Sequence, residues 1–316
     1  MNPQSVSSSF LIATGHIRAM RGGAQSHMLT ASDGHTYVVK FANNPQSVRV
    51  LANEWIASSI GRALGLTIPE PTILYVPASL IENSPSLVIR LSSATLKCSH
   101  GLAFGSRVIS GDEVFDYLPE SLFERIENRQ EFFGAFALDK WLCNCDGRQV
   151  LFCRREPNRN FRAHFIDFGY CFNAEEWNFP DTTTRGVYAR RCVYQDVCGW
   201  QSFEPWLSRI ESFDLLTLWE IAADVPPEWA EPDRLAQLIE CIYARRSRVR
   251  ERFANPHTTH SAHGRSSSHD AEVLEVPHRQ LQRLDHLHRC SRTPRLGREG
   301  LGRRSVPSQL YRKTTI

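Results

Sequence analysis

The chain has 316 residues, of which 41% are hydrophobic and 10% aromatic, so it can bury the core of one large or two modest domains. No apolar run is long enough to cross a bilayer, and the segment MNPQSVSSSF lacks the charged and apolar regions of a signal peptide. We therefore expect a cytoplasmic protein with no membrane partner. The nine cysteines have neither paired CxxC units nor regular spacing, which indicates reduced thiols.

The formal net charge of +3 is distributed unevenly along the chain. Residues 254–316 hold eleven Lys/Arg against five Asp/Glu, whereas residues 1–253 hold 26 against 29. Residues 254–316 also contain seven of the twelve histidines and show no sustained apolar period, which predicts a disordered basic tail. The remainder has no excess of positive charge for gripping nucleic acid, so direct nucleic-acid binding is not expected.

The first part of the chain predicts β-strands interrupted by one helix. An Asp-Gly turn at Asp33 and Gly34 divides one of the strand segments. The helix is expected from Ser47 to Leu64, where apolar residues roughly keep a 3.6-residue period. The pattern predicts a five-stranded sheet with the helix between its third and fourth strands. The strand segments are 10–20, 27–42, 72–81 and 86–91.

From Glu120 onward the pattern is mainly helical. Two short apolar segments, 149–154 and 162–172, separate the first helix from the others and are typical of a β pair. The expected helices are 121–142, 200–213, 214–225 and 231–253. The order predicts an α+β fold of two lobes, in which residues 1–92 form a β-rich N-terminal lobe and residues 93–253 a mainly helical C-terminal lobe.

Two features near the start suggest a phosphate site. Gly22 and Gly23 fall at the turn between the first two strands and would let backbone amides approach a polyanion, although paired glycines are more often mere turn residues. Lys40 ends the strand YVVKF and would point into a cleft if Val39 points to the opposite face. Glu54, fourteen residues later on the expected helix, could pair with Lys40 and hold it against phosphate oxygens.

Two later carboxylates complete a stronger pattern. Asp146 lies in a loop between the long helix and a short strand, and Asp167 opens an Asp-Phe-Gly sequence ending at Gly169. Phosphoryl transfer needs a cation on the phosphates, a carboxylate near the attacking hydroxyl and a carboxylate holding magnesium. Lys40, Asp146 and Asp167 supply these groups in the order that kinases use.

Four motifs carry a resemblance to a known family: GGAQ at 22–25, VVKF around Lys40, NxDGR at 144–148 and IDFG around Asp167. Over residues 15 to about 210 the chain resembles the HipA-like kinases, relatives of the phosphatidylinositol-kinase branch of the kinase fold. The resemblance implies a bilobal kinase fold with ATP and Mg2+ as cofactors. It implies Asp146 as the catalytic carboxylate, Asp167 as the main magnesium ligand, and a nucleotide site of Gly22, Gly23, Ala24, Gln25, Ser26, Lys40 and Glu54.

One position departs from the family pattern. Such kinases usually have an asparagine five residues after the catalytic aspartate, whereas this chain has Leu151. The carbonyl of Gln149 could supply the missing metal ligand, and Asn144 is a second candidate. We therefore keep three hypotheses: a Ser/Thr kinase acting on a protein acceptor, a pseudokinase acting as a nucleotide-binding interaction module, and, weakest, a small-molecule or lipid kinase. Any antitoxin-like partner would be a separate chain.

Three further features have competing interpretations. Arg148 could steady the catalytic carboxylate or pair with Asp139, and we favour the structural pairing. The segment 173–188 follows IDFG where kinases keep an activation loop, which makes Thr182, Thr183 and Thr184 candidate phosphorylation sites. Aromatic residues near this segment either fill the core or form a ligand-binding face, and we expect them in the core. They are Trp177, Phe179, Trp200, Phe203 and Trp206.

Overall fold

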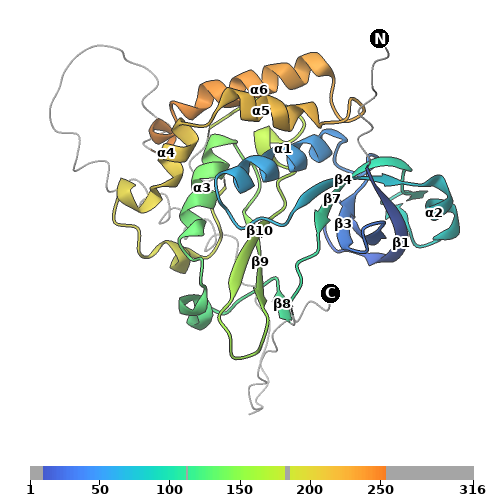
Figure 1. Ribbon diagram of the computed structural model, residues 1–316, viewed down its shortest axis with the longest axis horizontal. Coiled ribbons are helices and arrows are strands. Elements are labelled where there is room, and N and C mark those ends of the chain that lie inside the picture. Colours follow the sequence, from blue (N-terminus) through green and yellow to red (C-terminus); the bar gives the residue numbers. More distant parts are fainter. Residues whose placement is uncertain (1–9, 112, 182–185, 254–316) are drawn as a thin grey trace, which may run out of the picture.

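The computed structural model describes residues 10–111, 113–181 and 186–253. Its β-rich part is a closed five-stranded barrel with the strand order β1-β2-β3-β7-β4 (Figure 1). The Asp-Gly turn joins β2 to β3 as expected, with Gly34 at φ 79° and His35 N donating to Asp33 Oδ1 at 3.0 Å. The barrel strands are β1 (Leu11–Ala19), β2 (His27–Ala31), β3 (Thr36–Lys40), β4 (Pro71–Val76) and β7 (Gly101–Arg107).

The expected helix between the third and fourth strands is α1 (Arg49–Ala63). It packs against β4 and β7 on one side and against α5 (Leu215–Ala223) on the other, so it connects the barrel to the helical part of the molecule (Figure 1). Nearly every turn of α1 carries buried side chains, including the polar Asn53 and Glu54. Because buried polar groups need partners, these two residues point to a structured polar contact beside the helix.

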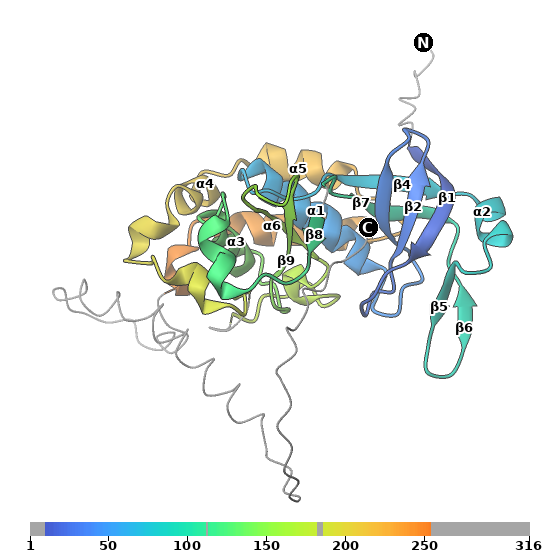
Figure 2. The same ribbon diagram turned by 90° about the horizontal axis from the view of Figure 1, so that it is seen from below.

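The β-rich part extends beyond the boundary expected at residue 92. The segment 86–91 was expected as the fifth strand, but β5 (Val88–Arg90) pairs with β6 (Thr95–Lys97) in a separate hairpin (Figure 2). The fifth barrel strand is instead β7, which pairs with both β3 and β4. The prediction was wrong here because strand propensity does not specify which distant strand becomes the partner.

Two other predicted elements differ from the observed ones. The expected strand 72–81 ends at Val76. The next residue, Pro77, has an extended backbone and lies just before the first residue of α2 (Ala78–Asn83). The expected helix 121–142 is broken into η1 (Glu120–Arg125), a 3-10 helix, and α3 (Glu131–Trp141). The break occurs because the side chain of Asn128 accepts from Ala163 N at 2.8 Å and donates to Ala163 O at 2.9 Å, which holds the intervening segment against a neighbouring strand.

The remaining elements are a second sheet with the strand order β10-β9-β8 and the helices around it. The hairpin of β9 and β10 confirms the β pair predicted within the helical half (Figure 1). These elements are β8 (Glu113–Phe115), β9 (Gln149–Arg154), β10 (Arg162–Ile166), η2 (Cys171–Asn173), η3 (Arg191–Tyr194), η4 (Trp200–Phe203), α4 (Trp206–Glu211), α6 (Pro232–Arg246) and η5 (Arg250–Phe253).

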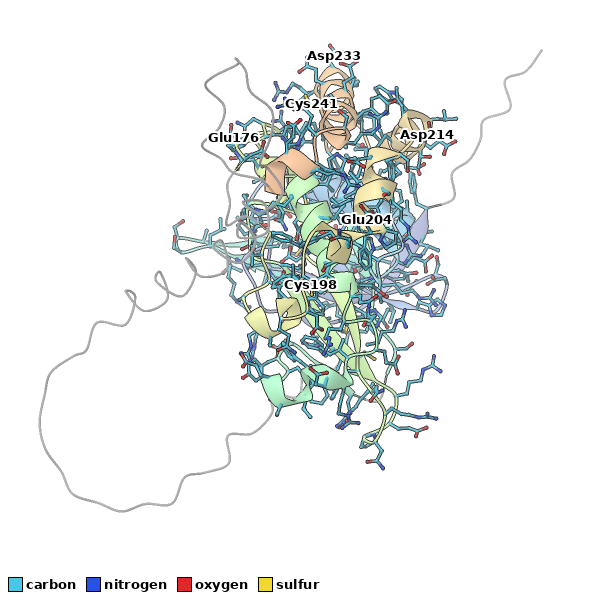
Figure 3. The ribbon with its side chains drawn as sticks, turned by 90° about the vertical axis from the view of Figure 1, so that its left-hand side faces the viewer. Glu176, Cys198, Glu204, Asp214, Asp233 and Cys241 are labelled. Atoms are coloured by element: carbon cyan, nitrogen blue, oxygen red, sulfur yellow. The ribbon has the colours of Figure 1, made fainter. Side chains whose placement is uncertain are left out.

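Most of the aromatic residues near the IDFG segment lie in the core, as expected. Trp177, Phe203 and Trp206 are buried, and Phe179 packs partly buried against the same cluster. The cysteines of the described part are free thiols, and Cys198 and Cys241 lie at the surface of the helical part (Figure 3). Within the described ranges, no helix combines the length and apolarity needed to cross a membrane. Residues 254–316 and Thr182, Thr183 and Thr184 lie outside the described residues, as does the side chain of Trp200.

Candidate active site

A cleft with a volume of about 210 Å³ lies between the barrel and the β9–β10 hairpin. Polar side chains enter it from both parts of the fold, and apolar side chains line much of its wall. The polar group includes Ser26, Lys40, Glu54, Gln149 and Asp167, and the apolar group includes Met28, Val38, Phe104, Leu151 and Phe168. An apolar cleft with a few converging polar groups is the usual form of a small-molecule site.

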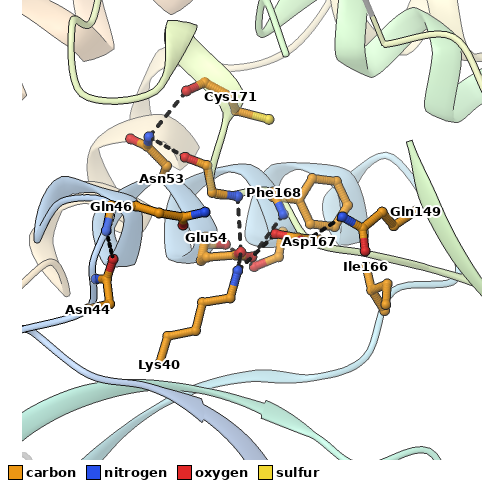
Figure 4. Close-up of polar contacts among 12 residues, drawn as sticks. Lys40, Asn44, Gln46, Asn53, Glu54, Gln149, Ile166, Asp167, Phe168 and Cys171 are labelled. Atoms are coloured by element: carbon orange, nitrogen blue, oxygen red, sulfur yellow. Dashed lines mark hydrogen bonds and ion pairs between the residues drawn. The ribbon is translucent and has the colours of Figure 1, made fainter. Parts of the chain in front are cut away.

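Lys40 reaches this cleft because of strand alternation. Val39 is buried in the barrel interior, whereas Val38 and Lys40 face the cleft, as the sequence predicted. The ammonium of Lys40 forms ion pairs with Glu54 and with Asp167 Oδ1, the latter at 2.8 Å (Figure 4). Burial would lower the pKa of Lys40, but the charges of Glu54 and Asp167 outweigh it and raise the pKa above its ordinary value. Lys40 is therefore a fixed cation.

Glu54 joins Lys40 to the Asp-Phe-Gly segment. Besides the ion pair with Lys40, its carboxylate accepts hydrogen bonds from Phe168 N and Gly169 N, both at 3.0 Å (Figure 4). A Cβ at Gly169 would lie 2.6 Å from Val50 Cγ1 and 3.2 Å from Glu54 Oε1, so this close approach requires glycine. Burial raises the pKa of Glu54, whereas Lys40 and the backbone N–H of Phe168 favour its charged form.

Asp167 is held at a strained backbone position. Its φ of 64° places a non-glycine residue in the left-handed region, where strain is often found at functional sites. One carboxylate oxygen accepts from Lys40, and the other accepts from Gln149 Nε2 at 2.8 Å. Burial would raise the pKa of Asp167, but Lys40, and further off Arg148, lower it below its ordinary value. Asp167 therefore favours its charged form, and its carboxylate lies at the cleft.

Asn53, which neighbours Glu54 on α1, is a site residue that the sequence did not predict. The fully buried amide of Asn53 donates to the carbonyls of Gly169, Cys171 and Ala174 at 2.8–3.2 Å and accepts from Trp177 Nε1 at 2.8 Å. Asn53 and Glu54 together therefore bind both the N–H and the C=O groups of the segment after Asp167. The available signal was a polar residue that shares a helix face with Val50, Ile56 and Ala57, but its partners lie more than a hundred residues away.

The loop that carries Asp146 is built on a buried ion pair. The guanidinium of Arg148 donates to both carboxylate oxygens of Asp139 at 2.9 and 2.6 Å, which confirms the favoured structural pairing. It also donates to the carbonyl of Ile166 at 2.6 Å and so links this loop to the end of β10. Burial would lower the pKa of Arg148, but the charge of Asp139 outweighs it and raises the pKa.

Asn144 belongs to the same support beneath Asp146. Its side chain is fully buried, donates to Asp139 Oδ1 at 2.9 Å and accepts from Asp146 N at 3.1 Å. Both ends of its amide are therefore used inside the protein, which argues against Asn144 as a second metal ligand. The carboxylate of Asp146 itself is exposed and accepts from Gly147 N at 2.7 Å.

The structure brings together only part of the predicted site. Ser26, Lys40, Glu54, Gln149 and Asp167 line the cleft, whereas Asp146 and the first four residues of the loop at 22–26 do not. The loop of Asp146 nevertheless lies beside the segment that follows Asp167, since Cys145 N donates to Tyr170 O at 3.0 Å.

The Gly-rich loop joins β1 to β2, and some of its residues make contacts that stabilise the fold. Gly22 has a φ of 126°, which favours glycine, and its carbonyl accepts from Gln25 N at 3.2 Å. The side chain of Gln25 exchanges two hydrogen bonds with the backbone of Arg90 in β5, at 2.6 and 2.7 Å. The side chain of Gln25 is therefore an anchor for the β5–β6 hairpin.

The family of the chain follows from comparison with known proteins. The model of the HipA-like kinase family matches residues 16–257, and the chain belongs to this family. No curated protein sequence matches the chain. Among solved structures, the Helicobacter pylori proinflammatory kinase CtkA is similar at 14% identity and a TM-score of 0.47, covering 87% of this chain and 97% of that one. The Golgi casein kinase with Mn/ADP bound is similar at 10% identity and a TM-score of 0.46, covering 77% and 71%.

Proposed function

We propose that this protein is an ATP-dependent kinase that transfers the γ-phosphate to a Ser or Thr hydroxyl of a protein acceptor. The observation that carries the proposal is the cluster of Lys40, Glu54, Asp167 and Gln149 at one cleft. The β-rich and helical parts would act as two lobes with the nucleotide between them. Membership of a kinase family supports the reaction class.

Lys40 is suited to bind the nucleotide phosphates. An ammonium has three N–H donors, and Glu54 and Asp167 use two of them. The third can donate to a phosphate oxygen while Glu54 holds the side chain in place. Apolar residues such as Met28, Val38 and Phe104 would contact the base and exclude water from it.

The oxygen donors at the cleft fit Mg2+. This ion is usually bound by one or two carboxylates together with substrate phosphates and waters, and not by a dedicated protein cage. Accordingly, the described residues contain no group of three or more His, Cys, Asp or Glu side chains that could hold a metal. Asp167 would be the main ligand, and Gln149 could turn its amide oxygen toward the ion. When bound, the ion would neutralise charge on the transferred phosphoryl group.

Asp146 would serve the acceptor side of the reaction. Its exposed carboxylate stands on the loop supported by Asp139 and Arg148 and could accept a proton from an incoming hydroxyl. In the proposed step, the hydroxyl oxygen bonds to the γ-phosphorus, the bond to the β–γ bridging oxygen breaks, and ADP leaves. Asp146 receives the hydroxyl proton.

The test is transfer of radiolabelled γ-phosphate from ATP by the purified protein, to itself and to a generic protein acceptor, with and without magnesium. We expect magnesium-dependent label on Ser or Thr that disappears in Asp167→Asn. Label that is retained in folded Asp167→Asn would remove this residue from the mechanism. Label on lipid or a small molecule, but not on protein, would overturn the proposed acceptor class.

A pseudokinase is the second candidate, and the environment of Leu151 favours it. This apolar side chain lines the cleft at the position where the family pattern places an asparagine. In that case ATP with magnesium would raise the melting temperature, but no acceptor would be labelled. The absence of any thermal shift at millimolar ATP would count against both candidates.

A further inference from the structure

A second groove, with a volume of about 840 Å³, lies on the far side of the wall that bounds the nucleotide cleft. Its lining residues come from the end of α1 and the loop that leads to β4, from residues 107–110, from Glu127 and from the β9–β10 hairpin. Figure 1 shows where these elements lie in the fold. Six arginines line it, and we call it the arginine groove. They are Arg62, Arg107, Arg154, Arg155, Arg159 and Arg162.

The charge of the groove is only partly neutralised. Its lining contains three glutamates, Glu70, Glu127 and Glu156, against the six arginines. Arg107 pairs with Glu70 at 3.0 Å, and Arg159 makes a looser contact of 3.6 Å with Glu156. Arg154 pairs outside the lining with Glu113 at 2.6 Å.

Three of the arginines have no carboxylate partner among the described residues: Arg62, Arg155 and Arg162. Arg62 and Arg162 each make one neutral hydrogen bond, to Ile68 O at 2.8 Å and to Thr67 Oγ1 at 3.1 Å, so most of their N–H donors stay available. Burial, helped by the charge of Arg162, lowers the pKa of His164 in the lining to about 4. The arginines alone therefore supply the positive charge at neutral pH.

We propose that the arginine groove binds an acidic segment of a partner protein. Arginine forks match carboxylates bidentately, and side chains such as Leu66, Ile68 and Val108 offer apolar contact to residues between the acids. A nucleic acid fits less well, because none of the described lining residues is a Phe, Tyr or Trp that could stack on a base, and the three glutamates would repel a continuous phosphate backbone.

The groove adjoins the nucleotide cleft but does not include the cluster of Lys40, Glu54, Gln149 and Asp167. Arg107, Val108 and Ile109 line both the groove and the cleft, whereas Lys40 and Asp167 line only the cleft. An acidic segment bound here would not occupy the nucleotide site. The binding proposal therefore goes beyond the kinase reaction and does not depend on it.

Fluorescence anisotropy with the full chain tests the proposal, using a labelled peptide of repeated Glu-Glu-Leu triplets as the probe. We expect saturable binding that weakens with added salt and is about tenfold weaker in Arg155→Glu. Arg155 is exposed and forms no ion pair with the described residues, so the variant should retain the wild-type melting temperature. Arg248→Glu is the matched control, because Arg248 is 61% exposed on the helical side, away from the groove, and the change in net charge is the same.

Three outcomes would overturn the proposal. One is the absence of saturable peptide binding at low salt, and another is equal weakening in Arg155→Glu and Arg248→Glu, which would mean attraction by net charge only. The third is tighter binding of single-stranded oligothymidylate with the same number of charges, which would assign the groove to nucleic acid. Titration with ADP in parallel monitors the nucleotide cleft separately, so failure of one site does not imply failure of the other.

Discussion

Asp167 and Asp146, the two proposed functional carboxylates, are supported by the protein in opposite ways. The carboxylate of Asp167 is itself held, by Lys40 and Gln149, and Asn53 and Glu54 bind the backbone that follows it. The carboxylate of Asp146 is exposed, and the contacts instead lie beneath it, among Asp139, Asn144 and Arg148. The first arrangement suits the proposed magnesium ligand, whereas the second leaves a carboxylate open to the proposed acceptor.

The largest expected effect separates the two carboxylates. Asp146→Asn and Asp167→Asn should each lower phosphoryl transfer by about 10³-fold, because each removes a charge that the reaction needs. Only Asp167→Asn should also lower the melting temperature, since it removes an ion-pair partner of buried Lys40. Phosphate transfer and thermal unfolding measured on both variants test this. Equal melting temperatures for the two would contradict the comparison.

The support beneath Asp146 should be sensitive to loss of one buried charge. Arg148→Leu leaves Asp139, which is fully buried, without its cation and should destabilise the protein by about 3–5 kcal/mol. Urea unfolding measures the change. The double variant Asp139→Leu with Arg148→Leu removes both charges and should recover much of the loss. A double variant no more stable than Arg148→Leu would show that this pair matters for more than charge compensation.

The contacts of Asn53 should affect both the stability of the fold and the proposed binding of magnesium by Asp167. Asn53→Leu leaves Trp177 Nε1 and three carbonyls without their partner, and should destabilise the protein by about 2 kcal/mol. Hydrogen exchange should quicken at the amides of 169–174 but not at those of β4, the internal control. The magnesium concentration for half-maximal transfer should also rise, and unchanged magnesium dependence would mean that Asn53 is purely structural.

Replacing Gln149 should weaken the use of magnesium in transfer and have little effect on the stability of the fold. Gln149→Ala removes the amide beside Asp167 Oδ2 and should raise the magnesium concentration for half-maximal transfer by about tenfold. Gln195→Ala is a suitable control, because Gln195 is also exposed but contacts Glu124 outside the cleft. If both variants behave like the wild type, Gln149 is not a metal ligand.

The smallest expected effect lies outside both regions. Asp214 caps α5 by accepting from Thr217 N at 3.1 Å (Figure 3). Asp214→Ala should cost about 1 kcal/mol of stability, as helix N-caps usually do, and leave magnesium dependence unchanged. Thermal unfolding and the transfer assay check both parts. A changed magnesium dependence would show that general destabilisation can imitate the Asn53 and Gln149 effects.

Much of the local structure follows from the sequence. The helix α1, the turn at Gly34 and the β9–β10 hairpin match their predicted segments because periodicity, turn residues and strand propensity act over short distances. The pairing of Lys40 with Glu54 was also predictable, because strand alternation and a helix fourteen residues on constrain both side chains. The order of Lys40, Asp146 and Asp167 along the chain is by itself enough to indicate the chemical class.

Tertiary structure alone decided the long-range partners. The choice of β7 as the strand that closes the barrel, the use of Gln25 to hold β5 and the binding of distant carbonyls by Asn53 each join residues with no local relation in sequence. The same is true of the arginine groove, whose arginines come from three separate segments. Composition and spacing determine which residue types are present, but only the folded backbone determines which of them face one another.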